Sequence, residues 1–152
     1  MDTPARRRFI SVLAGFAAAP LWPARPAHAQ ADPFAALVGK ITGGAAVRSG
    51  RVTVETPRLA DNGHSVPFKV SVTSPMTQSD HVRSITLLSE RNPRPIIATY
   101  YLGPRAGRAE VATRVRLNGS QRVLAVAQLS DGSYWSGMAE VEVTESACLD
   151  AT

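Results

Sequence analysis

The sequence is poor in the residues that most enzymes and metal proteins use. Its 152 residues include one cysteine and three histidines, and only 6% of them are aromatic. It contains no Gly-rich phosphate loop, no Cys-x-x-Cys, no His-Glu-x-x-His and no Gly-x-Ser-x-Gly. These absences argue against a nucleotide-dependent enzyme, a zinc site and a serine hydrolase, and they predict that this chain is not itself an enzyme.

The sequence also lacks an uncharged apolar run of the roughly 20 residues that a membrane-spanning helix needs. The run that follows the arginines at 6–8 ends at Pro20, and Ala27 and Ala29 are the small residues that a signal peptidase reads. We therefore predict a signal peptide over residues 1–29. Arg-Arg-x-Phe-Ile, from Arg6 onward, resembles the twin-arginine signal. The mature protein is expected in the periplasm, with no membrane anchor.

Excess charge of one sign is small once this leader is set aside. The whole chain has 17 Lys and Arg against 12 Asp and Glu, a net charge of +5. Four basic residues and Asp2 belong to the leader, which leaves 13 basic and 11 acidic residues spread along the mature sequence. This balance gives no support to nucleic-acid binding.

Short alternating segments rich in Val, Ile and Thr make up the chain from residue 51 onward, and Gly, Pro, Asn or Asp bounds each one. They predict seven strands, over 51–56, 66–73, 83–89, 96–102, 109–117, 122–129 and 138–144. One helix is predicted over 32–41, with Asp32 as its N-cap and one apolar face beginning at Phe34. Without βαβ alternation, this order predicts an all-β, immunoglobulin-like antiparallel sandwich over residues 30–145.

Asn118-Gly119 lies between two alternating runs and predicts a type I′ hairpin there. One cysteine cannot form the inter-sheet disulfide of antibody domains, so apolar packing alone must hold the sandwich together. The predicted core includes Val111, Val115, Val123, Ala125, Ala127 and Trp135.

The single cysteine, Cys148, follows the last predicted strand, where a chain terminus is seldom buried. In an oxidising periplasm such a thiol is buried and inert, bonded to another chain, or reactive. A terminal position favours the last two, namely a reactive thiol or an intermolecular disulfide in a non-catalytic interaction subunit. A third alternative is a copper site, whose candidate ligands are His64, His81, Met76 and Cys148. Their spacing does not favour it, and no metal or cofactor is expected.

An ordered series of motifs points to a family. It consists of Pro-Arg-Leu-Ala-Asp-Asn-Gly-His-Ser-Val-Pro at 57–67, Val-Ser-Val-Thr-Ser-Pro-Met at 70–76, Asn-Pro at 92–93, Leu-Gly-Pro-Arg-Ala-Gly at 102–107 and Ser-Asp-Gly-Ser-Tyr-Trp at 130–135. With the leader and the late cysteine, the series resembles SoxY, the sulfur-carrier family of the periplasmic thiosulfate-oxidising system, from about Phe34 to Cys148.

The resemblance implies an immunoglobulin-like carrier, without a cofactor, that forms a heterodimer with a second sandwich protein, SoxZ. It also implies that Cys148 matches the family's cysteine, which holds the sulfur substrate covalently on a swinging arm. In that family a c-type haem enzyme joins thiosulfate to the thiol, and a metal-dependent hydrolase later releases sulfate. A thiolate is the form of cysteine competent for such bonding.

The arm, residues 146–152, departs from the family's Gly-Gly-Cys-Gly-Gly pattern. It begins with Ser146, Ala147, Cys148, Leu149 and Asp150. Glycine provides backbone freedom and a thin profile, which Leu149 removes. Asp150 and the preceding Glu145 place negative charge near the thiol, which disfavours the thiolate and repels thiosulfate. The arm is similar to that of a SoxY-related subgroup, whose tail reads Ala-Ala-Cys-Ile-Glu.

Four further residues are predicted to form a partner interface. Tyr100 and Tyr101 are neighbours on one predicted strand, so one of them must face outward. Arg105 and Arg108 flank Gly107 in the loop that follows. Their exposure would suit contact with a second protein.

Overall fold

The structure is a computed structural model, and it describes residues 32–146. The predicted leader lies outside this range. The described part contains one α-helix, nine strands and one 3-10 turn. Their bounds are α1 Ala35–Thr42, β1 Val47–Ser49, β2 Val52–Glu55, β3 Leu59–Asn62, β4 Val66–Val72, β5 Val82–Ser89, β6 Ile96–Tyr101, η1 Pro104–Ala106, β7 Glu110–Val115, β8 Gln121–Leu129 and β9 Tyr134–Glu145.

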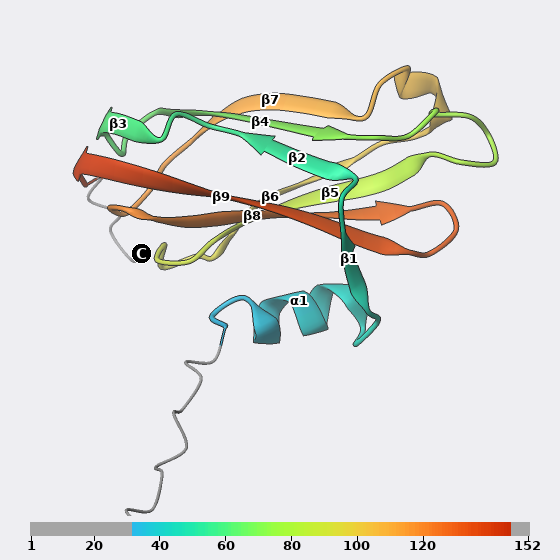
Figure 1. Ribbon diagram of the computed structural model, residues 1–152, viewed down its shortest axis with the longest axis horizontal. Coiled ribbons are helices and arrows are strands. Elements are labelled where there is room, and N and C mark those ends of the chain that lie inside the picture. The colour runs from blue at the N-terminus through green and yellow to red at the C-terminus, as the bar shows by residue number, and fades with distance from the viewer. Residues whose placement is uncertain (1–31, 147–152) are drawn as a thin grey trace, which may run out of the picture. The chain divides into compact units, whose positions relative to one another are not determined.

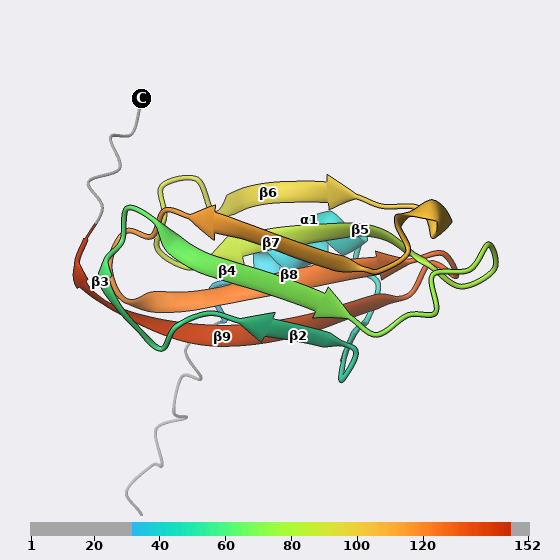
Figure 2. The ribbon, with the colours of Figure 1, turned by 90° about the horizontal axis from the view of Figure 1, so that it is seen from above.

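The strands form two facing sheets, and α1 lies on the outer face of the larger one (Figure 1). The larger sheet has the order β1-β9-β8-β5-β6, with β3 also paired to β9, and the smaller has the order β2-β4-β7. Viewed from above, the strands of both sheets run along the same long direction (Figure 2). The immunoglobulin-like sandwich predicted from the sequence is therefore confirmed, with nine strands rather than seven.

The two additional strands, β1 and β3, both pair in parallel with β9, so the sandwich is not wholly antiparallel. β1 pairs with the first residues of β9 and β3 with the last ones, and between them the chain crosses to the other sheet as β2. Asp61 and Asn62, predicted as turn residues, belong to β3. β1 and β3 lack the alternation of β-branched and polar residues that reveals β2, which is equally short.

The crossing brings the backbones of β2 and β9 into direct contact. A Cβ added to Gly137 would lie 2.3 Å from the carbonyl oxygen of Val52. Gly50, with φ +109°, occupies the bend before β2, a conformation that favours glycine. Gly137 therefore permits the two sheets to join at this side.

The hairpin predicted at Asn118-Gly119 is wrong. β7 pairs with β4, whereas β8 pairs with β5 and β9, so the strands flanking Asn118 belong to different sheets. Among described residues other than glycine, Met76 is the one with positive φ, so Asn118 does not adopt the type I′ conformation. Because both edges of β8 are occupied, the loop forms a corner between the sheets. The hairpin lies instead between β8 and β9, at Asp131-Gly132.

The core between the sheets largely matches the prediction. The buried members of the predicted set are Val115, Val123, Ala125 and Ala127. Val111 and Trp135 are only partly buried and pack against the edge of the core. The Trp135 ring is covered instead by two guanidinium groups, with the Cζ atoms of Arg48 and Arg51 at 5.8 and 5.0 Å from its centroid.

The N-cap lies two residues later than predicted, because Phe34 takes this position and Asp32 lies outside the helix. Asp32 Oδ1 accepts a hydrogen bond from the Phe34 backbone N–H at 3.2 Å. The helix ends at Thr42, one residue later than predicted, and Gly43 caps it with φ +63°. Within the described residues, no helix is long and apolar enough to cross a membrane.

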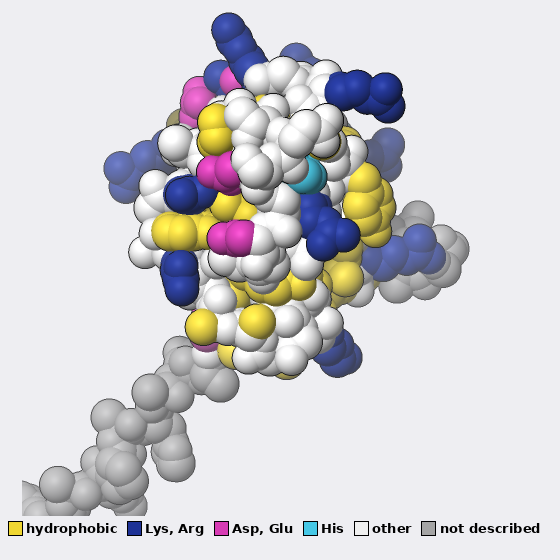
Figure 3. All heavy atoms as spheres, turned by 90° about the vertical axis from the view of Figure 1, so that its right-hand side faces the viewer, with side chains coloured by type: hydrophobic (Ala, Val, Ile, Leu, Met, Phe, Trp, Pro, Cys, Tyr) yellow, Lys and Arg dark blue, Asp and Glu magenta, His cyan; other side chains and the backbone are white. Residues whose placement is uncertain are grey.

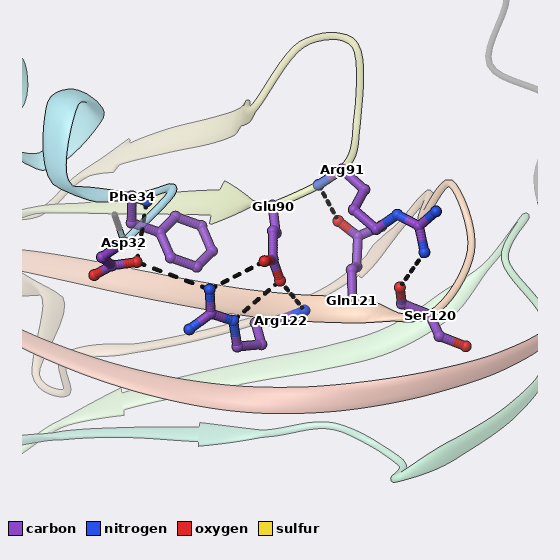
Figure 4. Close-up of polar contacts among 7 residues, drawn as sticks. All are labelled: Asp32, Phe34, Glu90, Arg91, Ser120, Gln121 and Arg122. Carbon is purple, nitrogen blue, oxygen red and sulfur yellow. Dashed lines mark hydrogen bonds and ion pairs between the residues drawn. The ribbon is translucent and has the colours of Figure 1, made fainter. Parts of the chain in front are cut away.

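Phe34 attaches the start of α1 to the outer face of the larger sheet. Its side chain is 1% exposed and packs with Leu88, Leu124 and Val126. The Arg122 guanidinium lies 5.6 Å from the Phe34 ring centroid, on the sheet beneath the helix (Figure 4). Burial of an aromatic side chain of this size makes Phe34 the main anchor of the helix.

Candidate functional site

The candidate site is the point where β9 ends and the chain continues toward Cys148. Cys148, Ala147, Leu149 and Asp150 lie outside the described residues, and Ser146, which is exposed, is the last one described. We call the end of β9 and the residues that hold it, Val143–Ser146 with Ser120 and Gly63, the arm root. Its geometry shows how the chain is held before it reaches the cysteine.

On one side, the arm root is held by β3. Leu59, Ala60 and Asn62 pair with Glu142, Val143 and Glu145, respectively. The Gly63 backbone N–H donates to the Glu145 carbonyl oxygen at 2.8 Å, which extends this pairing to the end of β9. The Thr144 hydroxyl donates to the Asp61 carbonyl oxygen.

On the other side, a side chain replaces the missing strand. The pairing of β8 with β9 stops at Gln121 and Val141. One residue before Gln121, the Ser120 hydroxyl accepts a hydrogen bond from the Val143 N–H at 2.8 Å and donates to the Val143 carbonyl oxygen at 3.3 Å. Since buried backbone groups need partners, β9 is fixed on both sides almost to its last residue.

The corner loop at 118–120 packs directly against the arm root. A Cβ on Gly119 would lie 3.0 Å from Ser146 Oγ and 4.0 Å from an Arg91 guanidinium nitrogen. Gly119 is buried and has φ +79°. A side chain at this position would therefore push on the first residue of the arm.

A buried amide organises the loops around the corner. Gln121, only 4% exposed, donates from Nε2 to Asn92 Oδ1 at 3.1 Å and accepts from the Arg91 N–H at 2.9 Å. Asn92 Oδ1 also accepts from the Asn118 N–H at 2.9 Å. These bonds tie the β5–β6 loop to the corner and place Arg91 beside the arm root (Figure 4).

Arg91 is the positive charge that this arrangement brings to the arm root. Its guanidinium donates to the Ser120 carbonyl oxygen at 3.1 Å, and no ion pair joins it to a carboxylate within residues 32–146. The neighbouring Glu90 is already paired with Arg122, whose guanidinium donates to both carboxylate oxygens at 3.0 Å. This contact holds the pKa of Glu90 below its ordinary value.

Arg91 could not be recognised from the sequence, because residues 91–94 show only the pattern of a turn. Its place beside the arm root results from the pairing of β5 with β8 and of β8 with β9. A local sequence pattern does not reveal pairings between strands that are far apart in the sequence.

The predicted interface residues lie at the opposite end of the larger sheet. Tyr101 pairs with Ser84, near the β8–β9 turn, and Arg105 belongs to η1. Tyr101 is 85% exposed, Tyr100 packs against the core, and Arg105 and Arg108 are exposed. The structure thus confirms that one tyrosine faces outward, and it separates these residues from the arm root.

The histidines and Met76 do not form a metal site in the described part. His64 follows β3 at the arm root, whereas the His81 N–H donates to Ser130 Oγ at 3.1 Å, beside the far end of β9. The Met76 sulfur is buried and accepts from the Val82 N–H at 3.4 Å. Within residues 32–146, no group of three or more His, Cys, Asp or Glu side chains is placed to hold a metal ion.

Comparison with known proteins gives one family and one fold. A family model described as "Sulfur oxidation protein SoxY" matches residues 38–148. The solved sulfur carrier protein SoxY from Chlorobium limicola f thiosulfatophilum is 24% identical, with a TM-score of 0.61, over 72% of this chain and 94% of that chain. No curated protein sequence matches significantly.

Superoxide reductases are also similar in structure. The neelaredoxin of Ignicoccus hospitalis is 16% identical, with a TM-score of 0.57, over 64% of this chain and 94% of that chain. A putative superoxide reductase from Thermotoga maritima is 20% identical, with a TM-score of 0.56, over 65% and 95%. At such identities these likenesses show a shared sandwich and nothing of its chemistry. The family match, in contrast, runs from α1 through every strand to residue 148, and this chain therefore belongs to the SoxY family of sulfur oxidation proteins.

Proposed function

We propose that this protein is a periplasmic carrier, not an enzyme, which holds thiosulfate-derived sulfur on Cys148 and presents it to partner enzymes. The observation that carries the proposal is the extent of the family match, which ends at residue 148, the position of the chain's single cysteine. A similar solved protein is itself named a sulfur carrier.

The arm root suits such a carrier. β9 is hydrogen bonded on both sides as far as Val143 and on one side to Glu145, and Ser146 is exposed. Two further residues span at most about 7 Å, which sets how far the thiol reaches beyond this fixed point. A cysteine attached to a rigid root stays close to the sandwich, so docking of the sandwich on an enzyme also delivers the thiol.

The loading chemistry follows from a thiol and thiosulfate. The thiol gives up its proton, its sulfur bonds to the outer sulfur of thiosulfate, and two electrons pass to the c-type haem enzyme. In the next step water attacks the sulfonate sulfur, the bond between this sulfur and its neighbour breaks, and sulfate and a proton leave. A persulfide remains on Cys148. Both steps use the thiol as an attachment point, and neither requires a catalytic group on the carrier.

The arm of this chain fits the Ala-Ala-Cys-Ile-Glu subgroup, because Ala147, Leu149 and Asp150 are conservative counterparts of its residues. Glu145 and Asp150 flank the cysteine in the sequence with negative charge, and Arg91 brings a positive charge to the arm root. The arm therefore has less backbone freedom than a glycine-rich arm. The positive charge of Arg91 at its root offsets part of the negative charge in its sequence.

Two further parts of the proposal concern location and partners. The leader over 1–29 directs export by the twin-arginine pathway, which carries folded proteins. The mature carrier then forms a heterodimer with a SoxZ-like sandwich subunit and meets a c-type haem enzyme and a metal-dependent hydrolase in the periplasm.

The test replaces Cys148 in the organism's own gene and follows thiosulfate consumption by whole cells. We expect Cys148→Ser to abolish consumption and Ser146→Ala, in the same arm, to leave it nearly unchanged. Consumption by the Cys148→Ser strain at the parental rate would contradict the proposal. Non-reducing gels separate the alternative, since a tail disulfide predicts a covalent dimer that Cys148→Ser cannot form.

A further inference from the structure

Arg91 keeps most of its hydrogen-bond donors available at the arm root. A guanidinium has five N–H donors, and one of those of Arg91 binds the Ser120 carbonyl oxygen, at 3.1 Å. The side chain is exposed, and no carboxylate in the part of the chain that the structure describes forms an ion pair with it. The guanidinium is therefore held at one point and can bind an anion with its other donors.

The acid next to Arg91 in the sequence does not neutralise it. Glu90 accepts hydrogen bonds from Nε and Nη2 of Arg122, both at 3.0 Å. Arg122 is also the main reason why the pKa of Glu90 lies below its ordinary value, whereas Arg91 contributes least. Figure 4 shows the Arg91 side chain extending away from this pair, toward Ser120. Arg122 therefore satisfies Glu90 and leaves the charge of Arg91 for another anion.

Both ends of Arg91 are attached to the corner between the sheets. Its backbone N–H donates to Gln121 Oε1 at 2.9 Å, and its guanidinium donates to the Ser120 carbonyl oxygen. The Ser120 hydroxyl in turn binds the Val143 backbone of β9. A long side chain that is already fixed loses less conformational freedom when it binds a ligand, so Arg91 is preorganised beside the end of β9.

The guanidinium lies close to the start of the arm. A Cβ on Gly119 would lie 3.0 Å from Ser146 Oγ and 4.0 Å from Arg91 Nη1, so these two atoms are at most about 7 Å apart. Cys148 follows Ser146 by two residues, which span at most about 7 Å. A sulfonate bound through thiosulfate to the thiol extends further, by two sulfur–sulfur bonds of about 2 Å each. These lengths allow such a sulfonate to reach the Arg91 guanidinium.

The arm itself carries negative charge only. Glu145 precedes Cys148, Asp150 follows it, and residues 145–152 contain no Lys or Arg. Thiosulfate is a dianion, and the adduct that it forms on a thiol keeps one negative charge on its sulfonate. A positive charge beside the arm favours the approach of the dianion and binds the sulfonate of the adduct.

We infer that Arg91 is the binding residue for the anionic cargo: its guanidinium attracts anionic sulfur compounds to Cys148 and pairs with the sulfonate oxygens of the adduct. The pairing uses two parallel N–H···O bonds, the geometry in which arginine recognises carboxylates and phosphates. The persulfide that remains after sulfate leaves has no such oxygens, so the contact ends when the cargo is hydrolysed. The inference rests on the proposed function, because it requires that Cys148 holds the cargo.

The test loads purified mature protein with tetrathionate, a dianion that needs no partner enzyme. The Cys148 thiolate attacks one inner sulfur, and the bond between the two inner sulfurs breaks. Thiosulfate leaves with the electron pair of that bond, the thiol proton goes to solvent, and the sulfonate-bearing adduct remains on the cysteine. Iodoacetamide, which is neutral, measures the reactivity of the same thiol, the single one in the chain. The ratio of the two rates therefore isolates the attraction of the anion.

We expect Arg91→Gln to lower this ratio about three- to tenfold, and Arg91→Lys, which keeps the charge, to retain most of the wild-type ratio. The matched control is Arg83→Gln, which removes an exposed charge at the start of β5, at the opposite end of the larger sheet. That end of the molecule faces the viewer in Figure 3, where basic side chains surround apolar ones. The control ratio should stay within about twofold of wild type, because salt screens charges at such distances. Thermal unfolding of each variant confirms that it is folded.

NMR of the loaded protein tests the pairing with the sulfonate. The Nε–H resonance of Arg91, assigned by its absence from Arg91→Lys, should shift when Cys148 bears the sulfonate and stay in place when it bears the neutral group from iodoacetamide. The inference is overturned if Arg91→Gln leaves the rate ratio unchanged, if Arg83→Gln lowers it equally, if Arg91→Lys lowers it as much as Arg91→Gln, or if the sulfonate does not move the resonance.

These measurements use protein loaded in vitro, so they are independent of the sulfur that Cys148 holds in cells. Selection of anions by Arg91 in a protein whose Cys148 never carries sulfur in cells would contradict the carrier proposal alone. Sulfur on Cys148 in cells, with a rate ratio that Arg91→Gln does not alter, would contradict this inference alone.

Discussion

Gly137 is the residue on which the joining of the two sheets depends. A Cβ there would lie 2.3 Å from the Val52 carbonyl oxygen and 2.9 Å from its carbon, and these are backbone atoms that cannot rotate away. We expect Gly137→Ala to lower the free energy of unfolding by about 2–4 kcal/mol, measured by denaturant titration.

The control is Gly39→Ala in α1, where a Cβ would meet nothing within 4 Å. Alanine favours helix over glycine, so this variant should gain up to about 1 kcal/mol. A Gly137→Ala protein as stable as wild type would show that β2 and β9 do not approach as closely as described.

Glu90 and Arg122 predict a pH dependence of stability. The hydrogen bonds from Arg122 lower the pKa of Glu90 from 4.5, so the pair stabilises the fold above the unfolded-state pKa and loses this contribution as the pH falls through the folded-state pKa. The free-energy difference between wild type and Glu90→Gln should thus be constant near neutral pH and shrink below about pH 4.5. Urea unfolding from pH 7 to pH 3 measures it, and a difference independent of pH would argue against the pair.

Among the structural elements, the end of β9 depends on one hydroxyl where a strand is missing. Ser120→Ala removes the acceptor that lies 2.8 Å from the Val143 N–H, and we expect a loss of about 1 kcal/mol together with faster hydrogen exchange at Val143. Ser130→Ala is the control, because Ser130 accepts from the His81 N–H at the other end of β9. Unchanged exchange at Val143 in Ser120→Ala would contradict this account of the arm root.

Seven strands were predictable because each carries a local alternation of at least several residues. β1 and β3 were not, since neither carries such an alternation and each is a strand only through its pairing with β9, which is distant in the sequence. Asn118-Gly119 gave a misleading hairpin signal because a tight turn between strands of one sheet and a corner between two sheets use the same local chemistry. The outcome is set by which edges of β8 are already occupied.

The site divides in the same way. An ordered set of motifs identified the family, which the match over residues 38–148 confirms, and the late, lone cysteine predicts the attachment residue; both signals are properties of the chain itself. The position of Arg91 beside the arm root results from strand order, so it emerges only when β5, β8 and β9 are placed side by side. Tyr101 was predicted only in part. Its adjacency to Tyr100 on one strand required one of the two rings to face outward, and the structure shows that it is the Tyr101 ring.

At the scale of the whole molecule, the arm root and Tyr101 lie at opposite ends of the larger sheet. β9 has twelve residues, and at about 3.3 Å per residue it spans roughly 40 Å. A molecule bound near Tyr101 would therefore lie far from the arm root.

A second prediction at this scale concerns the proposed export. If the leader is read by the twin-arginine pathway, changing Arg6→Lys together with Arg7→Lys should block transport, so that the precursor accumulates in the cytoplasm. Cell fractionation with intact-mass measurement checks this, and wild-type mature protein should begin at residue 30. Periplasmic mature protein from the double variant at the wild-type level would show that another route carries it.

The most direct test of the carrier claim is the mass of the peptide that contains Cys148, in protein isolated from cells oxidising thiosulfate. We predict a population bearing a thiosulfate-derived group or a persulfide, which a thiol reductant removes and which is absent from Cys148→Ser protein. If that peptide carries only a free thiol or glutathione at every stage of thiosulfate oxidation, the carrier account is wrong.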